Sequence, residues 1–360
     1  MIRNLIAAFF LACTWFWCIG GFFPVLIIRE FGPEIFFFFF TFNTIGAAAF
    51  GFAWTNESRQ NFLKRHGNTV RLFSLIVVGY HLVFVSWLAG LLENILILPA
   101  YLLAVAAFWG LRHRLFEVSV GLFGVTIMLF GLALGQPAPD YDYTVNPVPA
   151  SVLHGILPLA LGFLLAPYFD LTFHRAYVRS PQEKISFLIG LIVLFGVLLI
   201  GVYASVGLLE TLLSPRVIHP AGLWFLIGIM VLQFAFTSSA HLMELATTGL
   251  LTLRLNLLVA GVTGGLVAVY FMVVMRAPEL RVFLGLLTYR SFVFTIGGLF
   301  PLLILYRWDY RFVGAGVLVM VPCYGLGFLI GGIFVPFLSV AMVGLTLLWV
   351  VQRWYPIPAR

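Results

Sequence analysis

Residues 184–207 read KISFLIGLIVLFGVLLIGVYASVG, and after Lys184 this stretch contains no charged side chain. An apolar run of about 20 residues is long enough to cross a hydrocarbon core of about 30 Å as a helix. Similar runs recur along the whole chain, in which 62% of the residues are hydrophobic and only 9% are charged. Soluble domains carry roughly 25% charged residues. The sequence therefore predicts an all-α polytopic membrane protein.

The apolar runs predict about twelve transmembrane helices joined by short connections. The predicted spans cover 4–28, 34–54, 70–91, 95–111, 116–135, 151–169, 184–207, 221–251, 255–275, 282–305, 312–331 and 333–352. No linker or soluble domain interrupts them. We therefore expect residues 1–360 to form a single integral membrane domain.

Basic residues lie singly at the ends of the apolar runs and form no continuous stripe, which argues against nucleic-acid binding. If the N-terminus is cytoplasmic and the segments alternate sides, fifteen Lys and Arg residues fall in inner segments and four in outer segments, and Arg290 falls within a span. Cytoplasmic loops typically carry such an excess. The pattern predicts a multi-pass protein of the plasma (inner) membrane with both termini in the cytoplasm.

Two predicted spans are poor as continuous helices. The first contains the double glycine and proline of residues 18–24 (CIGGFFP), and the sixth contains Pro158, Gly162 and Pro167. Glycine and proline weaken a helix, and proline also leaves a backbone carbonyl without its partner. A packing kink explains each feature equally well when it is taken alone. However, the two spans open successive groups of five helices, and interrupted helices in corresponding positions favour a secondary transporter.

Polar residues recur along the predicted eighth span at intervals of four, four, three and four: Gln233, Thr237, His241, Glu244 and Thr248. This spacing places them on one helix face, with Ser238 and Ser239 beside it. In lipid, such a stripe must line a cavity or pair with another helix. Hydrogen bonding between helices is the simpler interpretation. We favour a functional stripe because two of its members are ionisable.

Residues 17–54 contain Gly20-Gly21, Phe31-Gly32 and Asn43-Thr44-Ile45-Gly46, and they resemble helices one and two of the amino-acid/polyamine/cation (LeuT-type fold) transporter superfamily. Its members include sodium/solute symporters and nucleobase-cation symporters. Residues 167–175 (PYFDLTFHR) are similar to the Asp-x-x-Arg-type segment that closes helix six of nucleobase permeases, with a spacing two residues longer. Residues 237–239 stand where those families carry the paired hydroxyls of a sodium site.

The resemblance covers roughly residues 10–305 and implies two inverted repeats of five helices, about 4–135 and 151–305, with two appended helices within 312–352. It also implies uptake coupled to Na⁺ held between helices one and eight. By that analogy the ligands are Ser238, Ser239, the carbonyl of Ala235, and carbonyls around Trp17 and Gly20.

Further candidates surround this centre. The candidate substrate-binding residues are Gly21, Phe22, Asn43, His81, Gly162, Gln233 and Arg290, and the candidate coupling or gating residues are Asp170, Arg175, His241 and Glu244. A lone histidine such as His81 is more often structural than a ligand. Arg290 suits a substrate carboxylate, although a pair with an acid of another helix explains it equally well.

We therefore expect a secondary transporter coupled to Na⁺, or else H⁺, that moves a small polar or carboxylated solute by alternating access. Its expected partners are the lipid bilayer and that solute. Neither a cofactor nor enzymatic activity is expected, because the sequence has no catalytic triad, P-loop or HExxH pattern. Two alternatives remain open. One is a sensor or structural subunit of the same fold that does not transport, and the other is a haem or pigment subunit with His81, His154 or His241 as axial ligands.

Overall fold

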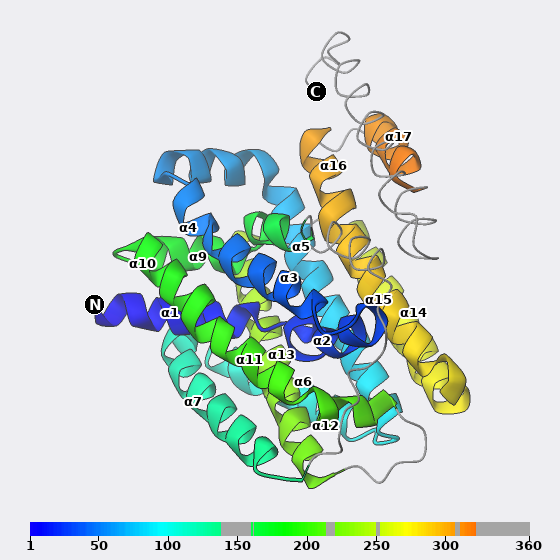
Figure 1. The fold of residues 1–360 in the computed structure, drawn as a ribbon. Coiled ribbons are helices and arrows are strands. Elements are labelled where there is room, and N and C mark those ends of the chain that lie inside the picture. The colour runs from blue at the N-terminus through cyan, green and yellow to red at the C-terminus, as the bar shows by residue number, and fades with distance from the viewer. Residues whose placement is uncertain (138–159, 161, 214–219, 250–252, 307–309, 322–360) are drawn as a thin grey trace.

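The computed structural model describes residues 1–137, 160, 162–213, 220–249, 253–306 and 310–321 (Figure 1). These residues are almost entirely helical and form no strand. Among them, seven helices are long and apolar enough to cross a membrane, and the pair Ile2–Trp15 and Cys18–Phe31 adds an eighth span if its two members count as one. The predicted all-α architecture is confirmed, and its apolar helices are those of a membrane-embedded protein. The twelve spans, the repeat and the orientation stay predictions.

The first half of the chain forms α1 (Ile2–Trp15), α2 (Cys18–Phe31), α3 (Ile35–Thr41), η1 (Phe42–Gly46), α4 (Phe50–Ala53), α5 (Asn56–Leu91), α6 (Ile97–Gly110), η2 (Arg112–Arg114) and α7 (Leu115–Leu134). The run α3–η1–α4 forms one apolar segment, Ile35–Ala53. α5 is kinked at His66, whose φ of −118° and ψ of 22° are not helical. The polar start of α5 therefore lies at a steep angle to its apolar remainder (Figure 1).

After the helical residues 162–169, the second half forms α9 (Leu171–Arg179), α10 (Glu183–Phe187), η3 (Leu188–Leu194), α11 (Phe195–Ala204), α12 (Val206–Glu210), η4 (Thr211–Leu213), α13 (Ala221–Thr248), α14 (Leu253–Arg276), η5 (Pro278–Leu280), α15 (Arg281–Phe294), η6 (Thr295–Leu299), α16 (Phe300–Leu305) and α17 (Tyr310–Val321). The predicted span 184–207 corresponds to the segment α10–η3–α11, Glu183–Ala204. The predicted last span, 333–352, lies outside the described residues.

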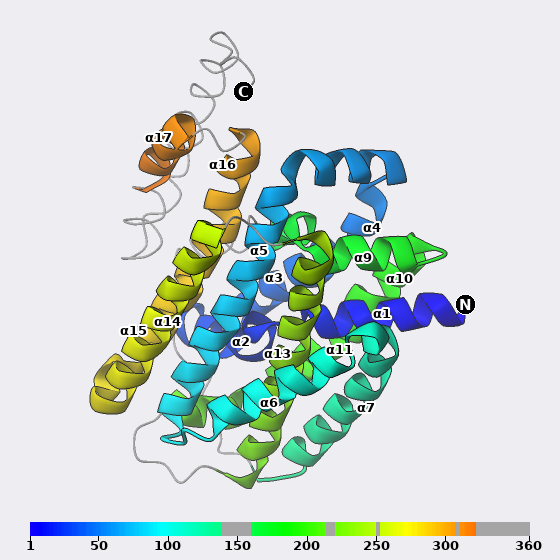
Figure 2. The same cartoon turned by 180° about the vertical axis from the view of Figure 1, so that it is seen from behind.

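Two long helices, α5 and α13, pack together in the middle of the molecule, and the other spans surround them (Figures 1 and 2). α13 also contacts α6 and α7, while α14 packs along α5 and α1 packs against α7 and η3. Only 11% of the most apolar stretch of α14 is buried, so most of that helix faces outward to lipid. In contrast, 67% of the most apolar stretch of α13 is buried, and so is every residue from Gln233 to His241.

The first span is interrupted, but not where the glycines and the proline predicted. α1 and α2 meet at an angle of 52° across Phe16 and Trp17, and Gly20, Gly21 and Pro24 lie inside α2. A Cβ atom on Gly21 would come within 2.8 Å of the Phe234 ring. This glycine therefore permits a close helix approach and does not make the break.

The predicted sixth span, 151–169, is helical where it is described, and the chain breaks just after it at Asp170, whose extended backbone (φ −81°, ψ 111°) separates the helical residues 162–169 from α9. The prediction of a break at Gly162 or Pro167 is therefore wrong. Two of the residues that the sequence singled out, Gly162 and Pro167, lie within the helical segment before this break. Pro158 lies outside the described residues. We call Phe16–Trp17 the first break and Asp170 the second break.

Candidate functional site

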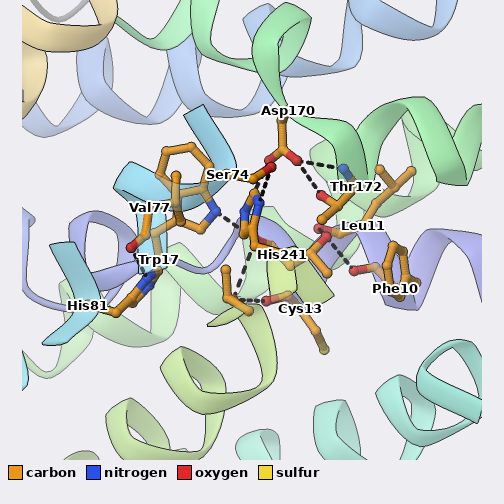
Figure 3. A network of polar contacts seen from close by, with 12 residues as sticks. Phe10, Leu11, Cys13, Trp17, Ser74, Val77, His81, Asp170, Thr172 and His241 are labelled. Carbon is orange, nitrogen blue, oxygen red and sulfur yellow. Dashed lines mark hydrogen bonds and ion pairs between the residues drawn. The ribbon is translucent and has the colours of Figure 1, made fainter. Parts of the chain in front are cut away.

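The two breaks approach each other around His241, with Trp17 on one side of this residue and Asp170 on the other (Figure 3). The ring centroids of Trp15, at the end of α1, and Phe173, in the first turn of α9, are 4.8 Å apart. The centroids of Trp17 and His241 are 6.2 Å apart. His241 Nε2 in turn lies 3.8 Å from Asp170 Oδ2, so His241 of α13 joins the two breaks.

Side chains satisfy the carbonyls that the first break leaves without helical partners. Thr237 Oγ1 on α13 donates to the carbonyl of Cys13 at 3.2 Å. The indole Nε1 of Trp17 donates to the carbonyl of Thr14 at 2.7 Å. Unwound backbone at membrane depth persists only where protein or water satisfies its polar groups. Here α13 and the break itself supply them.

The amide on the other side of the first break is satisfied by α5. The backbone N–H of Cys18 donates to His81 Nε2 at 3.4 Å, and His81 Nδ1 lies 2.8 Å from the carbonyl of Val77. Because Val77 offers only an acceptor, Nδ1 carries the hydrogen and Nε2 accepts. The predicted substrate candidate His81 therefore has both ring nitrogens engaged by backbone. An axial haem ligand at this position would have to give up one of these bonds.

The second break carries its own helix cap. Asp170 Oδ1 accepts hydrogen bonds from the backbone N–H and the hydroxyl of Thr172, both at 2.7 Å, and so caps the start of α9. Asp is a favoured residue at this position because its oxygen satisfies an amide that has no helical partner. On the other side, His174 Nε2 lies 3.0 Å from the carbonyl of Tyr168.

Asp170 and His241 form a buried acid–imidazole pair between the breaks (Figure 3). Both side chains are fully buried, and His241 Nδ1 lies 3.1 Å from the hydroxyl of Ser74 on α5. Asp170 Oδ2 and His241 Nε2 have no hydrogen-bond partner among the described residues. Their separation of 3.8 Å is longer than a hydrogen bond. A small shift of either side chain would bring the two atoms within hydrogen-bond distance.

The polar stripe predicted on α13 meets a different segment at each step. Gln233 Nε2 donates to Thr126 of α7 at 2.7 Å. On the next three turns, Thr237 contacts the first break, His241 contacts the second break, and Glu244 forms an ion pair with Arg175 of α9. The predicted fifth member, Thr248, is exposed. In this structure the stripe consists of contacts between helices, which is the simpler of the two interpretations.

Among the described residues, the two hydroxyls predicted to hold sodium on α13 form no hydrogen bond with Trp17 or Gly20 near the first break. Ser238 Oγ lies 2.7 Å from the hydroxyl of Tyr101 on α6. Ser239 Oγ donates to the carbonyls of Val105, at 3.0 Å, and Ala235, at 2.8 Å. Both hydroxyls therefore face α6. Thr237, about 100° from Ser238 around the helix axis, faces the first break instead. The contact of Thr237 with the first break was not predicted, although this residue belongs to the predicted polar stripe.

The remaining residues on the predicted ligand side, Trp17 and Gly20, lie at the first break and one turn beyond it. Trp17 is only 3% exposed and packs against Trp15 and Phe73. A Cβ atom on Gly20 would lie 3.6 Å from the ring of Phe195, an ordinary contact. Both residues therefore contribute packing around the break.

Three predicted substrate residues are packed among aromatic rings or bonded to backbone. Phe22 lies against Phe84 and Trp87, with centroids 5.9 and 5.2 Å away. The amide of Asn43 donates to the carbonyl of Phe39 within its own helix. Gly162 lies next to Val293.

Ion pairs lie at both ends of the central site. Arg290 of α15 is paired with Glu30 at the end of α2, which matches the acid-pair interpretation of this arginine. Arg29, next to Glu30, pairs with Glu210 of α12 at 2.5 Å. At the other end, Arg175 binds Glu244 through Nε and Nη2, the latter at 3.2 Å from Oε2.

No group of three or more His, Cys, Asp or Glu side chains arranged to hold a metal ion occurs in the described part of the chain, and His154 lies outside it. No protein-family model matches this sequence, and no curated protein is similar to it, so its function has to be inferred from the geometry of its own site.

Proposed function

We propose that this chain is a cation-coupled secondary transporter that moves a small polar or carboxylated solute by alternating access. The observation that carries the proposal is the meeting of two interrupted helices at one buried polar centre, where Trp17, His241 and Asp170 adjoin. Interrupted helices of this kind form the binding sites of many secondary transporters, because their free ends offer dipoles and backbone groups at the bilayer midplane.

The pattern of helix contacts supports an inverted repeat. If spans one to five correspond to spans six to ten, then α5 is equivalent to α13 and α6 is equivalent to α14. The contact of α5 with α14 then corresponds to the contact of α13 with α6, and both occur. Likewise, α1 packs on η3 of span seven, and Leu164 of span six packs on Gly46 of span two. Equivalent contacts are expected where two repeats are related by an axis in the membrane plane.

The ion pairs at the two ends supply candidate gates. Glu30–Arg290 joins α2, which follows the first break, to α15, and Arg175–Glu244 joins α9, which follows the second break, to the central helix α13. Alternating access requires that one end open while the other stays closed. A structure in which both pairs are formed corresponds to the occluded state of such a cycle.

We assign the coupling site to Asp170 and His241, and we favour H⁺ over Na⁺ as the coupling ion. Hard cations are bound by several oxygen ligands, whereas an imidazole facing a carboxylate can take up and pass on a proton. Ser74, Thr172 and Trp17 adjoin the pair. The nearest other ionisable groups are His81 on α5 and Glu244 on α13, whose carboxylate is bound by Arg175.

Alternating access can be tested without knowing the solute. In a background without Cys13, Cys18 and Cys323, reporter cysteines replace Leu171 at one end and Tyr289 at the other, each of which is only 4% exposed. Labelling with a membrane-impermeant maleimide is then measured in proteoliposomes from each side. Glu244→Gln opens the pair near Leu171, and Arg290→Gln opens the pair near Tyr289.

We expect reciprocal changes. Glu244→Gln should raise labelling at position 171 and lower it at position 289, and Arg290→Gln should do the opposite. Ser239→Ala, which lies beside neither pair, serves as the matched control. If both reporters respond together, or neither responds, the protein does not alternate and the sensor or subunit alternative replaces the proposal.

The coupling ion is tested with the same reporters. We expect the labelling ratio of the two positions to change with pH and to lose that dependence in Asp170→Asn. A ratio that depends on Na⁺ at constant pH, and remains so in Asp170→Asn, would overturn the assignment to the proton while leaving alternating access intact.

A further inference from the structure

A pocket of about 320 Å³ opens beside the Arg175–Glu244 ion pair. Its walls come from the polar start of α5, from α9 and from the end of α13. Its polar lining includes Arg59, His174, Arg175, Arg179, Glu244 and Thr247, and we call this site the arginine pocket. Small-molecule sites commonly have volumes of about 300–1,000 Å³, so the space suits a small ligand.

The charge of the arginine pocket is strongly positive. Three arginines line it and a single acid, Glu244, faces them. Both oxygens of that carboxylate are bound by Arg175, whose Nη2 also donates to Thr247 Oγ1 at 3.1 Å. Arg59 and Arg179 therefore leave positive charge in excess of the single acid within the pocket. The guanidinium of Arg179 lies 5.1 Å from the centre of the Phe116 ring, so this side chain stands at the edge of the pocket and also lines a neighbouring hollow beside Glu117.

Arg59 is the more unusual of these two cations because it is only 7% exposed. Its guanidinium lies 5.9 Å from the centre of the Tyr177 ring, within the range of a cation–π contact. Its Nε has no hydrogen-bond partner among the described residues. Burying a cation costs free energy unless it is paired. A planar guanidinium in this position is suited to bind an oxyanion.

His174 adds a second requirement on the ligand. The carbonyl of Tyr168 can only accept, so His174 Nε2 carries the hydrogen and Nδ1 of the neutral ring presents a lone pair. Nδ1 is buried and has no hydrogen-bond partner in the part of the chain that the structure describes. A ligand that satisfies it must donate a hydrogen bond, and the ring must shift towards the pocket to receive it because Nδ1 is enclosed.

We propose that the arginine pocket binds an oxyanion that also carries a hydroxyl group, such as hydrogen phosphate or a phosphate ester. Arg59 and Arg179 bind the anionic oxygens, and His174 Nδ1 accepts from the hydroxyl. The same chemistry is offered by a free phosphate compound and by the headgroup of an anionic phospholipid.

Binding of this anion also bears on the ion pair, although this consequence rests on the proposed transport function. Arg175 lines the pocket, so a bound anion competes with Glu244 for its guanidinium. Occupancy would then favour opening at this end of the molecule. The binding itself requires no transport and is tested separately.

The test uses the purified full chain and measures its melting temperature. In detergent, inorganic phosphate is compared with sulfate and chloride at constant ionic strength and pH 7, because sulfate has the charge of hydrogen phosphate but no hydroxyl. In a second arm, nanodiscs with and without phosphatidylglycerol are compared. Arg59→Gln and Arg179→Gln remove the anion ligands, and Arg65→Gln, an exposed position on the same segment of α5, is the matched control. Because Arg179 is exposed, its replacement leaves the fold intact.

We expect phosphate to raise the melting temperature by a few degrees in a saturable manner, more than sulfate does, in the wild type and Arg65→Gln. The rise should be lost in Arg179→Gln and Arg59→Gln. If phosphatidylglycerol alone gives the rise, the ligand is a lipid headgroup, and if phosphate alone gives it, the ligand is a soluble anion. No rise in either arm, or an equal rise in all variants, would overturn the site. Equal effects of sulfate and phosphate would overturn the part assigned to His174.

Discussion

The two helix breaks lie side by side but are held in different ways. At the first break, the carbonyls of Cys13 and Thr14 and the amide of Cys18 are all satisfied by neutral side chains from α13, α5 and the break itself. At the second break, one oxygen of Asp170 caps α9 while the other faces His241 without a hydrogen bond. The backbone of the first break is thus held by hydrogen bonds. The second break carries a carboxylate oxygen, Asp170 Oδ2, that has no hydrogen-bond partner among the described residues.

This difference suggests a division of roles between the two breaks. A backbone whose polar groups are all bonded keeps its shape when the charge around it changes. A carboxylate with one bonded and one free oxygen can gain a proton without losing its cap. We therefore expect substitutions at the first break to affect stability most, and conservative substitutions at the second to affect pH response most.

The largest effect is expected from Trp17→Ala at the first break. The ring is buried against Phe73, His241 and Phe292, and truncation of a large buried aromatic side chain typically costs about 3–5 kcal/mol. SDS unfolding titrations should show this loss. Trp224→Ala, at a position 45% exposed on α13, should cost far less. Equal losses in the two variants would mean that the first break is not a packed joint.

Thr237→Val keeps the shape of the side chain but removes the hydroxyl that bonds the carbonyl of Cys13. Leaving a buried acceptor unsatisfied costs about 1–3 kcal/mol. We expect this loss of unfolding free energy in the same titration, and recovery in Thr237→Ser. If Thr237→Val is as stable as the wild type, another group satisfies the first break.

At the second break, Asp170→Ala and Asp170→Asn separate the cap from the charge. Alanine removes the oxygen that accepts from Thr172, and loss of an N-cap costs about 0.5–2 kcal/mol. Asparagine retains an acceptor and should restore most of that stability. The pH response of the labelling ratio should be lost in both variants. A normal pH response in Asp170→Asn would assign the titrating group elsewhere.

The smallest effect, and the only favourable one, is expected from Gly20→Ala. Its Cβ would make an ordinary contact at 3.6 Å, and replacing a glycine inside a helix by alanine gains roughly 0.5–1 kcal/mol. Gly21→Ala should instead destabilise, because its Cβ would meet Phe234 at 2.8 Å. Destabilisation by both substitutions would indicate that the double glycine does help to form the first break.

The sequence predicted helix positions well and contacts poorly. Spans 34–54 and 221–251 correspond closely to Ile35–Ala53 and Ala221–Thr248, because an apolar run marks its own helix. The face of α13 that carries Gln233 and His241 was also predictable from spacing alone. The apolar and polar periods are local properties, and they can be read from neighbouring residues.

The positions of the breaks depend on partners that are distant in the chain. Cys18 is bonded by His81, and Cys13 is bonded by Thr237, more than two hundred residues away. No local pattern shows that such partners exist. The glycines and the proline therefore predicted the break within residues 18–24, whereas it lies at Phe16 and Trp17. In the same way, the hydroxyl of Ser238 is hydrogen-bonded to Tyr101 of α6, which is also distant in the chain.

The length of α6 has a consequence for the surrounding membrane. Its 14 residues rise only about 21 Å, well short of a hydrocarbon core of about 30 Å. Leu103, near its middle, is 71% exposed, and the charged Arg112 follows directly after its end. A bilayer adapts to a short apolar helix by thinning around it or by extension of flanking side chains towards the headgroups. If α6 spans the membrane as the sequence predicts, we expect the bilayer to thin beside it and the protein to be more stable in membranes with short acyl chains.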